Sequence, residues 1–565
     1  MTPFHAGELA IQERVGVRDH MAGAAAFIRE YMPEQHRQFY GQLPFFFLGA
    51  LDAAGQPWAT MLAAEPGFVS SPDERTLHIN GGMLAGDPLE GQLRVGDHVG
   101  GLGLEPTTRR RNRVNGQIVA ADEGGLRIAV TQSFGNCPQY IQHRQHSAAP
   151  DDGHKVQVLR GVVLTAADRE LIARADTFFI ATANMNEEAG RGRGVDVSHR
   201  GGRPGFVRID DERTLTSPEF VGNFFFNTLG NVNEYPRAGL LFIDFERGDM
   251  LHIAVDAEII WDGPQLAAFA GAERLLRFRV REVVRNVAVL PFRWTDAKPA
   301  MQVARTGSWG EADSAQSAAV LANSWRPFNV VKVEQESSDV RSFYLEPADG
   351  QGVAAHAAGQ YLSLRVPEWA ESGVALQERS YTISDAANGR SYRISVKRAG
   401  VVSSWLHDHL APGGQIELMG PAGDFVFEEG TQRPVVMLSA GIGITPMIAM
   451  LNSVLVNGSR TRHRYPIYFI HGAREVAHPF AVHLQELAAG HNNLALHVQK
   501  KRIDINLLRE LPQGDYDYYL CGPSGFMQDI YQDLRELGVP DQRIRLESFG
   551  PSSLPRSVPS VTQAA

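Results

Sequence analysis

The chain has 565 residues, more than one ordinary hydrophobic core holds, and at roughly 150 residues a domain this length predicts three or four domains. Apolar residues make up 43% and charged residues 21%, which is typical of globular proteins and argues against a disordered or membrane-embedded chain. The net charge of −10 disfavours nucleic acid and anionic lipid as partners, because both require a basic surface.

Cysteine content and the N-terminal residues bear on cofactors and location. The two cysteines are Cys137 and Cys521, whereas a [2Fe–2S] centre needs about four cysteine ligands, so we expect no disulfide framework and no iron–sulfur cluster. No segment approaches the roughly 18 apolar residues of a membrane span, and residues 1–30 carry acids where a secretory signal has a basic start. We therefore expect a cytoplasmic protein.

The first half of the chain contains an internal repeat. Each copy has Gly-Phe-Val and, after three more residues, Asp-Glu-Arg-Thr-Leu, with 138 residues between the copies. The paired segments are 67–77 with 205–215, 45–50 with 177–182, and the hairpins 100–119 with 239–260. Such self-similarity predicts a duplicated β domain, each copy a small antiparallel barrel, flanked by helices at 17–31, 165–174 and 265–274.

Three stretches of the first copy resemble the pyridoxamine 5'-phosphate oxidase-like split barrels. They are 43–58, the arginine hairpin 110–116 and 136–141. The resemblance implies FMN bound between two barrels. Because such barrels normally pair as homodimers, a tandem pair would form the FMN site within one chain.

Polar runs in the second copy, at 198–202 and 222–231, supply the cationic and amide donors that a flavin phosphate needs. The residues expected to contact FMN are Arg111, Arg113, Ser198, His199, Arg200, Asn223, Asn227 and Asn231. The alternative is that the asparagines cap turns and that Arg200 is a solvated loop arginine.

The arginine run 109–113 also has the composition of a nucleic-acid patch. It aligns with an ordinary hairpin in the second copy, and on a strand Arg111, Arg113 and Asn115 share one face. We expect contact with phosphate or flavin, with surface ion pairing as the alternative, and no nucleic-acid partner.

The pattern changes near Asn329, after a polar, alanine- and serine-rich linker, and strands are predicted at 329–333, 342–346 and 361–366. The run Arg379-Ser380-Tyr381-Thr382 follows on another predicted strand. Its arginine can neutralise a pyrophosphate, its tyrosine can lie against a flavin ring, and its threonine can hydrogen-bond near ring N5.

Two anion sites at helix N-termini are predicted further on. Ser403 and Ser404 begin a helix, where they either face a phosphate or only cap the helix. A buried strand at 434–440, the turn Gly441-Ile442-Gly443 and a helix at 447–455 are the parts of a pyrophosphate site, although not the three-glycine fingerprint. Alternating strands and helices then continue to 549, as in an α/β nucleotide-binding domain.

Together these motifs resemble the ferredoxin–NADP reductase superfamily, closest to the reductase part of flavohaemoglobins, over about 326–550. The resemblance implies a flavin-binding antiparallel β-barrel followed by a nicotinamide domain, with NADH or NADPH reducing FAD. It assigns FAD to Arg379, Ser380, Tyr381, Thr382, Ser403, Ser404 and Phe549. It assigns NAD(P) to Gly441, Gly443, Thr445, Pro446, Arg474, Cys521, Gly522 and Pro523, with Thr382, Cys521 and Glu547 around the transferred hydride.

Several alternatives stay open in this region. Cys521 is equally typical of a small buried thiol. Arg474 suits the 2'-phosphate of NADPH, whereas Glu475 suits the ribose hydroxyl of NADH. Histidine pairs at 143 and 146 and at 407 and 409 lack neighbouring ligands of the expected kind, so no metal site is expected.

The sequence thus predicts a multidomain fold. Its expected boundaries are 1–40 for an N-terminal helical segment, 41–150 and 160–297 for tandem split barrels, 298–325 for a linker, 326–430 for the FAD barrel, 431–550 for the NAD(P) domain and 551–565 for a tail.

Three functions are compatible with this organisation. The leading hypothesis passes electrons from NAD(P)H through FAD to FMN in the barrel pair and on to an unidentified small molecule or redox protein. The second makes the barrels a flavin-free docking module for a separate electron-acceptor protein. The third makes the chain a redox-sensing scaffold. Oligomerisation is compatible with all three.

Overall fold

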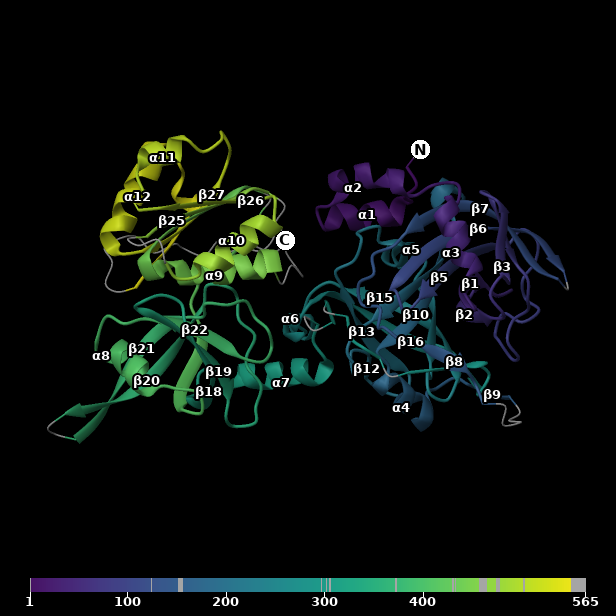
Figure 1. Cartoon of the computed structure of the whole chain (residues 1–565), viewed down its shortest axis with the longest axis horizontal. Coiled ribbons are helices and arrows are strands. Elements are labelled where there is room, and N and C mark those ends of the chain that lie inside the picture. The colour runs from purple at the N-terminus through teal and green to yellow at the C-terminus, as the bar shows by residue number, and fades with distance from the viewer. Residues whose placement is uncertain are drawn as a thin grey trace. The chain divides into compact units, whose positions relative to one another are not determined.

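The computed structural model describes residues 2–122, 124–150, 156–295, 297–300, 302–303, 306–370, 373–428, 431, 433–456, 465–473, 478–500 and 503–549. The chain divides into two compact units, Met1–Leu266 with Ala272–Trp309, and Ala267–Gly271 with Gly310–Ala565 (Figure 1). Arg474 and the predicted tail lie outside the described residues. Among the described residues, no helix combines the length and the apolar character that a membrane span requires.

The first unit contains two antiparallel sheets that follow three short helices, α1 (Ala6–Arg14), α2 (Arg18–Ala24) and α3 (Glu34–Gly41). The first sheet has the order β2-β1-β5-β6-β7-β4-β3. Its strands are β1 (Phe45–Leu51), β2 (Pro57–Ala63), β3 (Val69–Asp73), β4 (Thr76–Ile79), β5 (His98–Glu105), β6 (Arg110–Asp122) and β7 (Gly125–Gly135).

The second sheet repeats this order as β11-β10-β14-β15-β16-β13-β12, with β9 (Gln157–Gly161) added against β16. Its strands are β10 (Thr177–Asn184), β11 (Gly194–Gly201), β12 (Arg208–Ile209), β13 (Thr214–Phe220), β14 (Arg237–Ile243), β15 (Met250–Ile260) and β16 (Ala272–Val287). A short pair, β8 (His146–Ala148) and β17 (Phe292–Trp294), lies apart from both.

The two sheets agree in register as well as in order. Gly49 of β1 lies opposite Gly100 of β5, and the equivalent Ala181 of β10 lies opposite Gly239 of β14. The predicted duplication and both predicted hairpins are therefore present as pairs of strands with matching partners.

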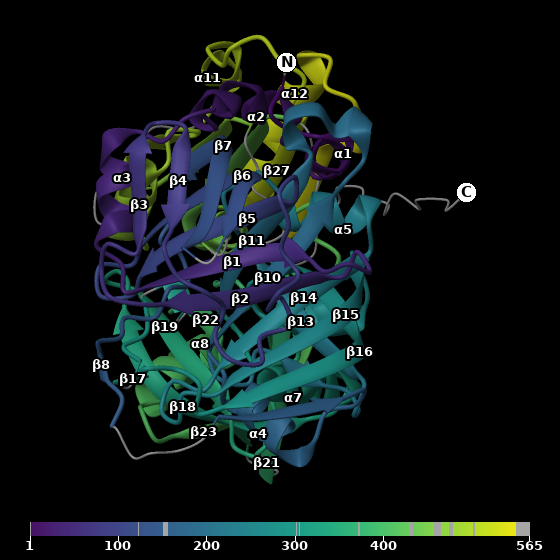
Figure 2. The ribbon, with the colours of Figure 1, turned by 90° about the vertical axis from the view of Figure 1, so that its right-hand side faces the viewer.

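The two copies pack against each other along β1, β2 and β5 of the first and β10, β11 and β14 of the second (Figure 2). Two equivalent glycines allow this approach. A Cβ on Gly100 would lie 2.4 Å from the carbonyl oxygen of Val195, and one on Gly239 would lie 2.3 Å from that of Pro57. Side chains from both copies then form one apolar core across the seam.

One of the three predicted flanking helices agrees with the structure, and the other two differ from it. The helix expected at 165–174 is α4 (Ala166–Arg174), which Thr165 caps. The one expected at 17–31 is shorter, because α2 ends at Ala24 in a 3₁₀ turn. The prediction at 265–274 was wrong beyond α6 (Pro264–Ala268): Gly271 has a φ of +80°, and from Ala272 the chain pairs with β13 as strand β16.

The second unit begins with an antiparallel sheet in the order β21-β20-β23-β18-β19-β22, as the strand predictions required. Its elements are β18 (Arg326–Gln335), β19 (Val340–Pro347), β20 (Tyr361–Ala370), β21 (Gly373–Thr382), β22 (Tyr392–Lys397), α8 (Val401–His409) and β23 (Gln415–Ala422). The predicted linker before it contains a helix, α7 (Trp309–Val320), which the sequence did not lead us to expect.

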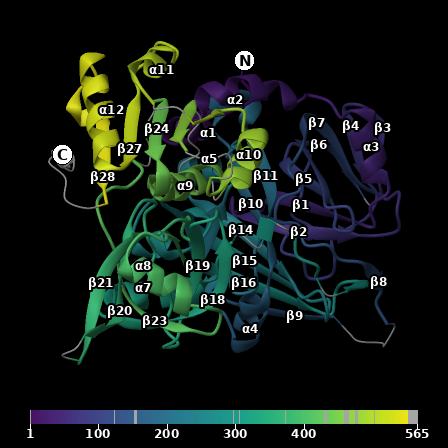
Figure 3. The ribbon, with the colours of Figure 1, turned by 60° about the vertical axis from the view of Figure 1, so that its left-hand side comes forward.

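A parallel sheet in the order β26-β25-β24-β27-β28 completes the second unit. Its strands are β24 (Val435–Ala440), β25 (Ile467–Gly472), β26 (Leu494–Gln499), β27 (Asp517–Gly522) and β28 (Ile544–Ser548), with helices α9 (Ile444–Leu451), α10 (Ala481–Gly490), α11 (Ile505–Arg509) and α12 (Ser524–Glu536). Helix α9 lies between this sheet and the antiparallel one (Figure 3), and it shares an apolar core with the parallel sheet and with Ala358, Phe425 and Phe427, which lie outside the strands.

Candidate flavin and nucleotide sites

The predicted FAD motif lies on β21, which is the edge strand of the antiparallel sheet. Arg379 and Ser380 are exposed, Tyr381 is half-buried and Thr382 is buried. Arg379 forms no ion pair with another described residue; its guanidinium donates only to the carbonyl of Glu378, at 2.7 Å. Burial raises the pKa of Tyr381 to about 12, so its phenol is neutral. An uncommitted cation beside a neutral aromatic ring suits a flavin with its phosphates.

The side chain of Ser403 hydrogen-bonds the start of its own helix, whose N-cap is Gly400. The Ser403 hydroxyl accepts from the N–H groups of Ala399 at 3.0 Å and Gly400 at 2.8 Å. The side chain is thereby occupied. An anion at this end of α8 would be held instead by the N–H groups of the first helical turn, which have no partner within the helix.

The parallel sheet brings the predicted nucleotide residues to its switch point. The chain passes from β24 to β25 and β26 on one side, whereas β27 and β28 lie on the other. The turn Gly441–Gly443 follows β24, and Cys521, Gly522 and Pro523 end β27 or follow it. In parallel sheets, ligands bind outside the carboxyl ends of the strands where the order reverses.

The two glycines of the turn have different physical roles. Gly441 has a φ of +57°, in the left-handed region that favours glycine. Gly443 makes a close approach: a Cβ there would lie 2.3 Å from the carbonyl oxygen of Cys521. Thr445 and Pro446 are buried beneath the turn, and the Thr445 hydroxyl donates to the carbonyl of Ile442 at 3.0 Å. These two residues shape the turn, and a pyrophosphate would meet its backbone.

Cys521 is fully buried, as the thiol alternative predicted, and it pairs with Glu547 across β27 and β28. Burial, and then the charge of Glu547, raises the pKa of this thiol well above its usual range, so it stays protonated. Thr382 lies in the other domain of this unit, and Phe549 is 48% exposed after β28. Of the three residues predicted to surround the transferred hydride, Cys521 and Glu547 thus lie side by side.

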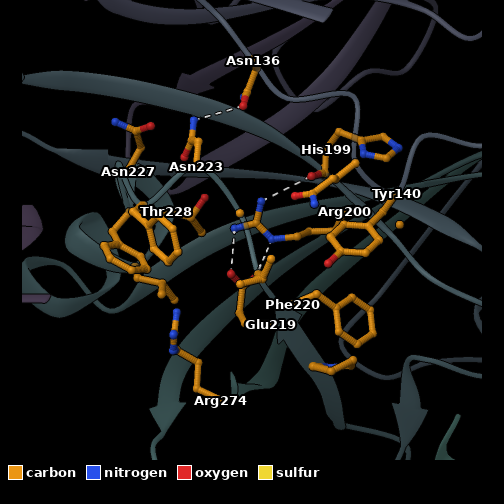
Figure 4. Close-up of a pocket in the computed structure, with 18 of the residues that line it drawn as sticks. Asn136, Tyr140, His199, Arg200, Glu219, Phe220, Asn223, Asn227, Thr228 and Arg274 are labelled. Atoms are coloured by element: carbon orange, nitrogen blue, oxygen red, sulfur yellow. Dashed lines mark hydrogen bonds and ion pairs between the residues drawn. The ribbon is translucent and has the colours of Figure 1, made fainter. Parts of the chain in front are cut away.

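A pocket opens between the two copies of the first unit (Figure 4). Its wall includes Arg111, Arg113, Asn136 and Tyr140 of the first copy and His199, Arg200, Glu219, Phe220, Asn223, Asn227, Thr228 and Arg274 of the second. Segments more than a hundred residues apart in the chain therefore meet at one cavity. Within the described residues, no group of three or more metal-ligating side chains is present there or elsewhere.

Most of the predicted FMN residues line this pocket, and two lie behind its wall. Ser198 is buried and bonded to Arg113 and to Thr228. Asn231 is buried; its Oδ1 accepts from Nε2 of His5 at 2.9 Å, and its Nδ2 donates to the Asp196 carboxylate at 3.1 Å. These two side chains hold the wall rather than face the cavity.

The pocket carries an excess of buried positive charge. Burial, and then the charges of neighbouring arginines, lowers the pKa of Arg111 to about 9 and that of Arg113 to about 10, so both remain cations. The Nε–H groups of Arg111, Arg113 and Arg274 have no hydrogen-bond partner among the described residues. Unpartnered buried donors of this kind favour an anionic ligand.

One of the earlier alternatives fails at this pocket. Arg200 is not a solvated loop arginine, because it lies on β11 and forms a two-contact ion pair with Glu219. Of the arginine run, Arg113 is only 5% exposed, whereas Arg110 is exposed. Arg111 donates to Nδ1 of His199 at 3.2 Å, and burial, with the nearby arginines, lowers the pKa of His199 well below its usual value, so this imidazole is neutral.

Sequence reasoning missed several residues of the pocket. Tyr140 and Phe220 face each other with ring centroids 5.2 Å apart, and Figure 4 shows both rings on the side opposite Asn227. Arg274 was hidden by the wrong helix prediction; the alternation of apolar and charged residues after Ala272 was the available signal for a strand. The role of Glu8 was also missed: it lies on α1, within the predicted N-terminal helical segment, and accepts from Asn227 at 2.5 Å.

Comparison with known proteins identifies the second unit. The oxidoreductase FAD-binding domain matches residues 327–427 and the oxidoreductase NAD-binding domain matches residues 437–532. The flavohemoprotein of Chromobacterium violaceum is 40% identical over 274 residues, 43% of this chain and 64% of that protein. The flavohemoprotein of Bacillus subtilis is 38% identical over 271 residues, 44% of this chain and 66% of that protein.

Among solved structures, the flavohem-like FAD/NAD binding domain of nitric oxide dioxygenase from Vibrio cholerae is 36% identical, covering 40% of this chain and 99% of that one, with a TM-score of 0.36. The chain spans less than two thirds of the length of the curated relatives. The two matched domains correspond to the antiparallel sheet and the parallel sheet described above. The C-terminal part of the chain is therefore an FAD-binding and NAD-binding oxidoreductase module.

Proposed function

We propose that the chain carries electrons from NADH or NADPH through FAD to FMN bound in the pocket between the two β copies, and from there to a small molecule or redox protein. The observation that carries the FMN assignment is the convergence of Arg111, His199 and Asn223 on one cavity, with the Nε–H groups of its buried arginines left without a hydrogen-bond partner among the described residues. In this proposal the tandem copies are an FMN-binding split barrel contained in one chain.

In the reductase module, the flavin supplies the chemistry, accepting a hydride and releasing electrons singly. The protein binds and orients. Arg379 neutralises phosphate charge, Tyr381 presents an aromatic face, and the turn at Gly441 places backbone N–H groups at the nucleotide pyrophosphate. The protonated Cys521 lies beneath this turn as an uncharged neighbour and takes no part as a nucleophile.

In the barrel pair, the residues fit a flavin mononucleotide by charge and by shape. Arg111, Arg113 and Arg274 offer unpaired N–H donors for a phosphate. Tyr140 and Phe220 offer ring faces close to them. Neutral His199 lines the same pocket and is able to donate through Nε2, because its Nδ1 accepts from Arg111.

Flavin counting tests the proposal directly. The purified chain is denatured with acid, and the released flavins are separated by chromatography; the expected result is FAD and FMN together. FAD without FMN would instead support the docking-module hypothesis. Anaerobic addition of NADH, then of NADPH, is expected to bleach flavin absorbance near about 450 nm with at least one of them. A cytoplasmic location and the absence of nucleic-acid partners stay predictions.

A further inference from the structure

The duplication creates two equivalent places for a ligand between the copies, and strand register identifies the residues of each. Arg113 pairs with Leu102 between β6 and β5, and His252 pairs with Leu241 between β15 and β14. Because Leu102 and Leu241 lie at equivalent positions, His252 is the counterpart of Arg113. Arg111 lies two residues before Arg113 on β6, and Met250 lies two residues before His252 on β15. Met250 is therefore the counterpart of Arg111.

The facing strands give the rest of the comparison. His199 pairs with Phe179 between β11 and β10, and Met61 pairs with the equivalent Phe47 between β2 and β1. The neighbouring Arg200 corresponds in the same way to Leu62. Four residues of the open pocket, Arg111, Arg113, His199 and Arg200, thus have apolar or uncharged counterparts across the seam.

The counterpart position is filled by packed side chains. Met61, Leu62 and Met250 are each no more than 2% exposed. His252 is fully buried, and its Nδ1 lies 3.1 Å from the carbonyl oxygen of Ala59. Burial lowers the pKa of His252, so this ring is neutral and supplies no positive charge.

The counterpart position also carries a carboxylate. Asp87 is 3% exposed and accepts from the hydroxyl of Thr60, which is the counterpart of Ser198. The loop that carries Asp87 is held against the second copy, where Asn286 donates to the carbonyl of Ala85 at 2.8 Å. Asp87 forms no ion pair with another described residue, so a phosphate at this position would meet an acidic side chain without a paired cation.

We propose that the barrel pair binds one phosphorylated flavin per chain, at the Arg111 face, and that the pseudo-symmetric Met250 face is closed to ligand. This inference rests on the proposed function, because FMN is the ligand it counts. The open face retains the cations Arg111, Arg113 and Arg200, whereas the closed face has Met250, His252 and Leu62 in their places.

The test uses the full-length chain, freed of flavin and then saturated with FAD, and titrated with FMN by isothermal calorimetry. One equivalent of FMN is expected. Arg111→Met, which copies the counterpart residue, is expected to weaken FMN binding at least about tenfold. The matched variant Met250→Leu is expected to change it less than about twofold, because it alters only packing at the closed face.

A second measurement guards against misfolding of the Arg111 variant. Riboflavin lacks the phosphate, so the wild-type chain is expected to bind it at least about tenfold more weakly than FMN, and Arg111→Lys is expected to keep that preference. Two equivalents of FMN, or one equivalent lost in Met250→Leu and kept in Arg111→Met, would overturn the single-site inference and leave the proposed function intact. Failure of the wild-type chain to bind FMN would overturn both.

Discussion

Phe47 and Phe179 stack face to face across the seam between the two copies, with ring centroids 3.7 Å apart and ring planes inclined by 18°. The two residues are counterparts in the repeat, so each copy contributes the same ring to the contact. In a symmetric dimer this is the arrangement of residues on the twofold axis. Here the contact joins two halves of one chain.

Truncating either ring is expected to destabilise the first unit by similar amounts. Phe47→Ala and Phe179→Ala each remove a fully packed ring, which costs about 3–5 kcal/mol. The double variant is expected to lose less than the sum, because the second truncation removes a contact already lost. Calorimetric melting of the full chain measures these changes, with Phe27→Ala as control because that ring is 62% exposed. Equal melting of the control and the seam variants would contradict the stacking contact.

Gly443→Ala is expected to slow reduction of FAD by NADH or NADPH at least about tenfold. The new Cβ would collide with the carbonyl oxygen of Cys521 and push apart β24 and β27 where the nucleotide binds. Anaerobic stopped-flow absorbance near about 450 nm records the rate. Gly525→Ala is the matched control, since a Cβ there meets nothing within 4 Å. Unchanged reduction in the Gly443 variant would remove this turn from the nucleotide site.

Arg379→Ala is expected to lower the FAD content of the purified chain without unfolding it. The guanidinium is exposed, and the one hydrogen bond that it makes to a described residue goes to a neighbouring backbone carbonyl, so the protein loses little when it is removed. A bound pyrophosphate would lose a charge-assisted contact worth roughly 1.5–3 kcal/mol. FAD released by acid gives the occupancy. Arg398→Ala, which removes an exposed ion pair with Asp408, serves as control and is expected to retain FAD.

Stability of the second unit is expected to fall on acidification, in part through His471. Burial lowers the pKa of His471 to about 3, whereas an unfolded histidine titrates near about 6.5. Between these values the unfolded chain binds one more proton than the folded one, so the free energy of unfolding falls by about 1.4 kcal/mol for each unit that the pH drops.

Melting temperatures measured from pH 7 to pH 5 test this dependence. His471→Gln removes the titrating group but retains a hydrogen-bonding side chain for Ser439, whose hydroxyl lies 2.9 Å from Nδ1. Its melting temperature is expected to depend less steeply on pH than that of the wild type. His20→Gln, at an exposed position, is expected to match the wild type. Parallel pH curves for all three proteins would refute the assignment.

Much of the fold was predictable because its signals are local or periodic. The repeat at Gly67 and Gly205 marked both copies, and the glycine turn at Gly441 marked the start of the nucleotide domain. The contact between Glu8 and Asn227 was not predictable, because neither residue carries a local sign of a partner more than two hundred positions away. The residues that close the Met250 face can likewise be identified only from the pairing of the strands.

The candidate sites were predicted more completely in residue type than in role. Ser403 was correctly placed at a helix start, yet its hydroxyl serves the helix itself. Cys521 was correctly placed at the switch point, yet the thiol is enclosed and its carbonyl makes the close contact with Gly443. Sequence spacing indicates which residues gather at a site, whereas packing determines which atoms they present.

Gly100 and Gly239 occupy equivalent positions, and each faces a backbone carbonyl of the opposite copy too closely for any other residue. In a homodimer, a single glycine codon would supply the glycine on both sides of the seam. In this chain two codons supply the two glycines separately, and a mutation at one position leaves its counterpart unchanged. Substitutions in the two halves of the seam are therefore inherited independently. In a pair of copies that began as symmetric, the Arg111 face can keep arginine while the Met250 face acquires methionine.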